Sequence, residues 1–159
     1  MYTKSFDIRW SDLDANKHLA NAAYLNFMSH TRMGFLMECG FSQQSMATHH
    51  IGPVVFYEHI YYFKEAFPGK PVSVSLELKG LSADGMFFEF HHNFYDHKGQ
   101  NFAHCEMMGA WIDMDARALT GLPNIFLEAF NTVEKASDFK VLTKEDTRKY
   151  ARKPQHKTV

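Results

Sequence analysis

The sequence has few of the features that mark secreted, membrane or disulfide-rich proteins. Its 159 residues include only two cysteines, Cys39 and Cys105, which show no CxxC or other metal-binding spacing. No segment approaches the roughly 18 consecutive apolar residues of a membrane-spanning helix. The first residues lack the basic and apolar regions of a signal peptide. These absences predict a cytoplasmic protein with no membrane partner and with reduced, packed thiols.

Several catalytic signatures are also missing. The chain has no Gly-x-Ser-x-Gly nucleophile motif and no glycine-rich phosphate loop. Cys39 falls near the expected end of a helix, where the helix dipole raises rather than lowers a thiol pKa. His91 and His92 are adjacent on an expected strand, so they point to opposite faces and cannot easily bind one metal ion. A serine or cysteine nucleophile and a metal site therefore have little support.

Composition and length indicate one globular domain. Hydrophobic residues make up 45% of the chain and charged residues 22%, which is ordinary for a folded protein. The net charge is −1, but residues 137–159 hold seven basic and three acidic side chains, so the remainder is acidic. An acidic body without a recognition motif predicts no nucleic-acid partner. We expect a domain over residues 1–136 and a basic, poorly ordered tail over residues 137–159.

Hydrophobic periodicity predicts two layers of secondary structure. The expected elements are a strand over residues 2–10, a helix over 21–39, strands over 54–65, 72–79, 86–96 and 102–113, and a helix from 122–123 to about 135. Asn21 suits a helix N-cap and Gly40 suits the position after a helix. Short, turn-like connectors predict an antiparallel meander. One face of that sheet could be buried by the first helix, giving an α+β domain.

A polar loop before the first helix carries the residues best suited to chemistry. Asp12, Asp14 and His18 lie between the first strand and the expected helix start at Asn21. A helix N-terminus presents unpaired N–H groups and a partial positive charge, which can stabilise an oxyanion. A carboxylate beside it could attack a carbonyl or activate water. Acyl chemistry is one interpretation, and simple capping of the helix is the other.

This stretch resembles the start of hot-dog-fold thioesterases of the 4-hydroxybenzoyl-CoA thioesterase-like superfamily. The residues that match the family pattern are Arg9, Trp10, Asp12, Asp14, His18, Asn21, Tyr24 and Leu25. Residues 52–58, 61–65, 68–72 and 122–123 also fit, so the resemblance covers roughly residues 4–135. It implies an α+β hot-dog fold, in which an antiparallel sheet of about five strands wraps around one long central helix, followed by a C-terminal helix.

The resemblance also implies roles for individual residues. Asp14 matches the family's catalytic carboxylate, a nucleophile or general base, with His18 and Asn21 in support. The oxyanion would be held by backbone N–H groups around Asn21, Ala23 and Tyr24, and the Tyr24 side chain would either line the acyl pocket or pack in the core. The family's His-x-Asn-Asn reads His18-Leu-Ala-Asn21 here, so Ala20 replaces one Asn.

Glu58 interrupts an aromatic strand and has two interpretations. Because family members dimerise with their sites at the interface, Glu58 could contact substrate in a neighbouring chain. Alternatively, it points outward from a strand buried on one side only, since parity alone does not say which face is buried.

The expected function is therefore hydrolysis of an acyl-CoA thioester by a homodimer or a dimer of dimers, without a metal or cofactor. An acyl carrier protein is an alternative carrier of the acyl group. A non-catalytic hot-dog protein that binds an acyl-CoA or a protein is the main rival. A hot-dog dehydratase or hydratase is a weaker one, because its Gly-Asp-x-Asn-Pro-x-x-His pattern is absent.

Overall fold

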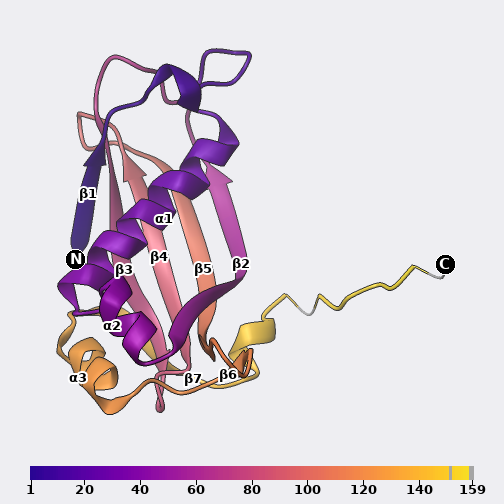
Figure 1. Ribbon diagram of the computed structural model, residues 1–159. Helices are drawn as coiled ribbons and strands as arrows, with labels where there is room; N and C mark the ends of the chain where they lie inside the picture. Colours follow the sequence, from indigo (N-terminus) through magenta and orange to yellow (C-terminus); the bar gives the residue numbers. More distant parts are fainter. Residues whose placement is uncertain (151, 158–159) are drawn as a thin grey trace.

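The computed structural model describes residues 1–150 and 152–157, and over these residues the chain forms one seven-stranded sheet with α1 along one face (Figure 1). The strands are β1 (Tyr2–Phe6), β2 (Ile51–Tyr62), β3 (Val72–Ser82), β4 (Phe87–Tyr95), β5 (Asn101–Asp113), β6 (Ala118–Leu119) and β7 (Lys135–Leu142). The helices are α1 (Asn21–Glu38), α2 (Gln43–Thr48) and α3 (Asn124–Thr132). This arrangement confirms the predicted α+β hot-dog class.

Helix α1 begins and ends close to the predicted positions. Its last turn is closed by Gly40, whose φ of +84° favours glycine, and Phe41 N–H donates to Leu36 O over 2.8 Å. At the other end, Ala20 rather than the predicted Asn21 is the N-cap, and Asn21 is the first helical residue. The side-chain Oδ1 of Asn21 still accepts from a first-turn N–H group, that of Ala22.

The sheet order is β1-β3-β4-β5-β2. Strands β3, β4 and β5 form the expected antiparallel meander, but β2 pairs with β5 and not with β3. The Pro-Gly turn at residues 68–71 closes a longer connection, residues 63–71, that crosses from one side of the sheet to the other. As a result, β2 lies at one end of the sheet and has an edge that pairs with no described strand.

The two faces of the sheet differ in chemistry. On the face beneath α1, Phe90 and Phe94 are fully buried, and their rings contact Phe35 and Tyr24 of the helix. The adjacent residues His91 and His92 confirm the predicted alternation. His92 is buried, and its Nδ1 lies 2.9 Å from Ser75 O. Burial lowers the pKa of His92 to about 3, so this ring is neutral.

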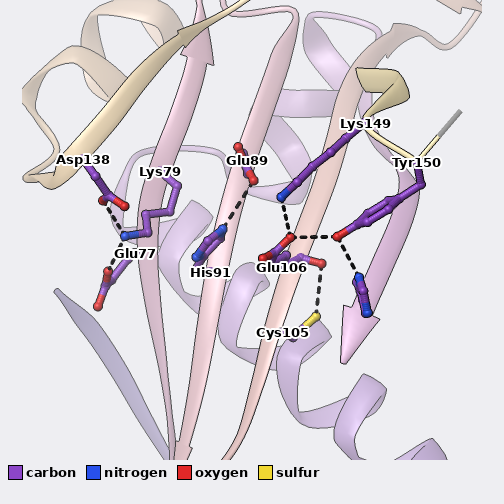
Figure 2. A network of polar contacts seen from close by, with 10 residues as sticks. Glu77, Lys79, Glu89, His91, Cys105, Glu106, Asp138, Lys149 and Tyr150 are labelled. Atoms are coloured by element: carbon purple, nitrogen blue, oxygen red, sulfur yellow. Dashed lines mark hydrogen bonds and ion pairs between the residues drawn. The ribbon is translucent and has the colours of Figure 1, made fainter. Parts of the chain in front are cut away.

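His91 lies on the opposite face, 3.3 Å from the carboxylate of Glu89 (Figure 2). The ion pairs of Lys79 with Glu77 and of Lys149 with Glu106 also lie on this face, which α1 does not cover and which we call the outer face (Figure 2). This placement follows from the high cost of burying charge in an apolar layer.

Residues 135–142 form a strand, where the sequence predicted that a tail begins at residue 137. Strand β7 runs parallel to β3, and Leu142 packs with Phe87 and Met108 on the outer face of the sheet. The packing is close, because a Cβ built on Gly80 would lie 2.6 Å from Leu142 Cδ2. Sequence periodicity missed β7 because its buried positions do not alternate regularly.

One smaller feature also differs from expectation. The polar connection at residues 42–50 contains the short helix α2, whose N-cap Ser42 accepts a hydrogen bond from Ser45 N–H over 3.0 Å.

Within the described residues, no helix combines the length and apolar character required to cross a bilayer.

Replacing Leu142 with Ala tests the packing of β7. Leu142 is 4% exposed, so Leu142→Ala should lower the free energy of unfolding by about 2–4 kcal/mol. Its neighbour Val141 is 62% exposed, and Val141→Ala should cost less than about 1 kcal/mol. Urea denaturation of the two variants measures the difference. Equal, small losses would contradict the docking of β7 on the sheet.

Candidate active site

A tight loop places Asp14 close to the start of α1. Leu13 and Leu19 form an isolated antiparallel bridge, and Asp14 N–H donates to His18 O over 2.9 Å. Lys17 closes the loop with a φ of +63°, and its N–H donates to Asp14 O over 3.0 Å. Leu19 N–H donates to Ala66 O over 2.8 Å, which ties the loop to the segment that follows β2.

Asp12 is a structural residue of this loop. Its side chain is 4% exposed and accepts from Arg9 Nε at 3.0 Å and Nη2 at 2.9 Å. The backbone carbonyl of Asp12 also accepts from Ala20 N–H over 2.8 Å, so Asp12 joins the segment that follows β1 to the start of α1. The hydrogen bonds from Arg9 hold the pKa of Asp12 below its usual range, despite its burial.

A pocket of about 370 Å³ lies beside this loop and contains four of the six predicted site residues. The predicted residues that line it are Asp14, His18, Asn21 and Tyr24. The opposite wall is formed by residues 62–66, at the end of β2 and beyond it. The polar loop that was predicted to carry the chemistry therefore does border a concave site.

The Asp14 carboxylate is held through one oxygen. Its Oδ1 accepts from Asn16 N–H over 2.8 Å and from His18 N–H over 3.1 Å. Among the residues that the structure describes, Oδ2 has no hydrogen-bond partner. The side chain is exposed at the mouth of the pocket, so Oδ2 is open to a ligand or to water.

The first turn of α1 offers fewer free N–H groups than predicted. Ala23 N–H donates to Ala20 O over 2.9 Å, and Ala23 itself is buried. Ala22 N–H donates to the side-chain Oδ1 of Asn21 over 2.9 Å. The backbone N–H of Asn21 has no partner within the described chain, which leaves it as the available donor at the helix start.

His18 faces Glu65 and not Asp14. Its Nδ1 lies 3.5 Å from Glu65 Oε1, and its ring packs edge-on against Phe67 with centroids 4.9 Å apart. His18 thus supports Asp14 through its backbone N–H, whereas its side chain belongs to the far wall of the pocket. Glu65 was not predicted as a site residue, although the aromatic run that contains it matched the family pattern.

Tyr24 packs in the core, and it also borders the pocket beside Asp14. Its side chain is 3% exposed, and its ring lies against Tyr62 and Phe94 with centroids 5.0 Å away in each case. It also forms part of the pocket wall. Burial, with Tyr62 and Asp14 nearby, raises the pKa of Tyr24 to about 12, so its hydroxyl stays protonated.

Glu58 lies apart from this pocket within the chain. Its Oε1 accepts from Arg32 Nη1 of α1 over 2.8 Å, and both side chains are largely buried. Glu58 therefore faces the helix, which resolves the ambiguity of strand parity. It sits four residues before Tyr62 along β2, so the structure does not bring it to Asp14.

The described residues contain no group of three potential ligands that could hold a metal ion. Both thiols are poor nucleophiles, because burial raises the pKa of Cys39 to about 11 and that of Cys105 to about 12. The pocket instead contains two carboxylates, Asp14 and Glu65.

The Asp12 pair generates a pH-dependent prediction. Because Arg9 is largely exposed, Asp12→Asn should cost only about 1–2 kcal/mol of stability near pH 7. The folded pKa of Asp12 is lowered, so its contribution is present above the unfolded value of about 3.9 and is lost as the pH falls through the folded value. Urea denaturation should show the wild-type advantage shrinking toward about pH 3.

The control for this experiment is Asp7→Asn, a matched change at an exposed position of the preceding segment. Asp7→Asn should leave the free energy of unfolding unchanged both near pH 7 and at about pH 3. If the difference in unfolding free energy between the wild type and Asp12→Asn stays constant with pH, the Arg9–Asp12 ion pair is not its source.

Comparisons with known proteins identify the family and the fold of this chain. The family model of the thioesterase-like superfamily matches residues 8–130, which is more than half of the chain. No curated protein matches the sequence.

Solved structures share the fold at low sequence identity. A hypothetical protein from Staphylococcus aureus, SAV2348, solved in complex with CoA, is 18% identical with a TM-score of 0.77, over 99% of this chain and 94% of that one. A DHNA-CoA thioesterase from Staphylococcus aureus is 17% identical with a TM-score of 0.75, over 81% and 87%. A 1,4-dihydroxy-2-naphthoyl-CoA thioesterase from Synechocystis, Slr0204, is 16% identical with a TM-score of 0.73, over 83% and 96%. On the evidence of the family model, this chain belongs to the thioesterase-like superfamily.

Proposed function

We propose that this protein hydrolyses acyl-CoA thioesters, with Asp14 as nucleophile or general base. The observation that carries the proposal is the unengaged Oδ2 of Asp14, in one pocket with the free N–H of Asn21 at the start of α1. Membership of the thioesterase-like superfamily supports thioester hydrolysis at the level of the family. The named thioesterases of the same fold act on CoA esters, which supports CoA as the carrier.

The chemistry follows from these two groups. A thioester carbonyl at the start of α1 would accept a hydrogen bond from Asn21 N–H, and the partial positive charge of the helix would stabilise the oxyanion. As a general base, Asp14 would take a proton from water while the hydroxide adds to the carbonyl carbon. Collapse of the tetrahedral intermediate breaks the C–S bond, and the thiolate recovers the proton, giving the free acid and the thiol.

A direct attack by Oδ2 is the other route from the same geometry. It would form a mixed anhydride with release of the thiolate, and water would then hydrolyse the anhydride. In both routes, Asn16 and His18 orient the carboxylate through their N–H groups to Oδ1. Asn21 Oδ1 occupies Ala22 N–H, so a substrate oxygen that needs a second donor must displace this side chain.

Asp14→Asn tests the role of the carboxylate. Asn keeps an oxygen for the N–H groups of Asn16 and His18, so the loop should fold normally while hydrolysis falls by about 10²-fold or more. Thiol release from a panel of acyl-CoAs and from an acyl carrier protein measures the loss. Asp7→Asn is the matched control and should retain full activity. Near wild-type turnover by Asp14→Asn would disprove the mechanism.

A second copy of the chain is the expected partner, and its contact would lie along β2. This strand presents a long unpaired edge on which Val55 and Phe56 are 48% and 41% exposed. Such an edge is a template for pairing with another strand. Pairing of two β2 strands would extend the sheet across both copies.

Light scattering coupled to gel filtration tests this contact. The wild-type protein should have the mass of two chains or of four, whereas a variant with Val55→Lys and Phe56→Lys should dissociate to a single chain, because charged side chains block edge pairing. Ile125→Lys places the same charge at a 63%-exposed position on α3 and should leave the mass unchanged. A monomeric wild type would contradict the proposed contact.

A further inference from the structure

A second pocket lies far from Asp14, where the C-terminal segment ends its path over the sheet. After β7, residues 143–150 continue across the outer face to β5 and β2, and we call this segment the strap. The strap includes a 3₁₀ turn, Asp146–Arg148, beside the lower part of β2 (Figure 1). It is fixed at its start by Leu142, which packs on Phe87 and Met108.

The end of the strap is anchored on Glu106 of β5. The Glu106 carboxylate accepts from Lys149 Nζ over 2.7 Å and from Tyr150 OH over 2.9 Å (Figure 2). Burial acts to raise the pKa of Glu106, but these two hydrogen bonds outweigh it and the pKa is lowered. The Tyr150 oxygen also lies 2.6 Å from His59 Nδ1, and its ring packs edge-on against Tyr57.

An open pocket of about 410 Å³ lies between β2, this anchored strap and Arg152, which follows the strap. Its side chains that matter here are two arginines and three aromatic rings: Arg148, Arg152, Phe56, Tyr57 and Tyr150. Within the described residues, neither arginine forms an ion pair. The one acidic residue of the wall, Glu58, is already paired with Arg32.

The residue types in this pocket match one class of ligand. A guanidinium group binds phosphate oxygens through paired, charge-assisted hydrogen bonds. Phe56 and Tyr150 are exposed, and exposed aromatic rings offer faces on which a nucleobase can stack, whereas Tyr57 is half-buried against Tyr150. The volume also falls within the range of small-molecule sites, about 300–1,000 Å³. We propose that this pocket binds a nucleotide, with Arg148 and Arg152 on its phosphates and the aromatic rings against its base.

The pocket and the Asp14 site are on different sides of β2. Tyr62 contacts Tyr24 of α1, whereas Tyr57 and His59 contact Tyr150 of the strap. A free nucleotide and the nucleotide portion of a CoA ester share the required chemistry. Binding of a CoA ester here rests on the proposed thioesterase function. It also requires a second copy of the chain, whose Asp14 site would hold the acyl end of the same CoA ester.

Calorimetric titration of the full-length protein with adenosine 3′,5′-bisphosphate tests the shared chemistry. The wild type should bind it saturably, and Arg148→Ala or Arg152→Ala should each weaken binding by about tenfold, the effect of losing one charge-assisted contact. Lys153→Ala and Lys157→Ala remove the same charge from positions that do not line the pocket, so they should leave affinity unchanged. Absent binding, or equal weakening by all four variants, would overturn the proposal.

Hydrolysis assays then distinguish the two sources. If the nucleotide belongs to the CoA ester, Arg148→Ala and Arg152→Ala should raise KM for an acyl-CoA by about tenfold and leave KM for the matching acyl-pantetheine unchanged. If both KM values stay constant while bisphosphate binding is lost, the site takes a free nucleotide. Asp14→Asn should bind the bisphosphate like the wild type, so failure of the thioesterase function and failure of this site are separate results.

Discussion

The candidate site depends on burial of one aromatic face of the sheet beneath α1. Phe90 and Phe94 are fully buried and contact rings of the helix, so α1 cannot slide without exposing large apolar surfaces. With α1 fixed, its first turn lies beside the end of β2. The loop that carries Asp14 is tied to both elements, through Ala20 and Ala66, and therefore has one position. The packing of α1 on the sheet thus sets the geometry of the pocket.

Charge is distributed according to the same constraint. On the face beneath α1, Arg32 and Glu58 form a largely buried ion pair near the edge of the sheet. The outer face carries several paired groups, and one of them, Glu106, anchors the strap. Because a buried charge is costly unless it is paired, the polar network and the apolar core occupy opposite faces. The sheet can therefore carry the Asp14 pocket on one side and a second pocket on the other.

Local patterns predicted the elements with strong periodicity. Helix α1, the meander of β3, β4 and β5, and α3 were expected close to their observed positions because each buries a regular set of residues. Helix α2 buries only Met46, and the buried positions of β7 are irregular, so neither gave a periodic signal. The predicted pairing of β2 with β3 was wrong, because the short turn at residues 68–71 does not specify which strands are neighbours in the sheet.

The fold class and the proximity of Asp14, His18, Asn21 and Tyr24 could be predicted from local sequence. These residues lie within one short stretch, so a loop and one helical turn suffice to bring them together. Three other contacts could not be predicted in this way: Glu65 with His18, Glu58 with Arg32, and the strap with β2. Each of these contacts joins segments far apart in the chain, and their meeting depends on the strand order and on which face each side chain enters.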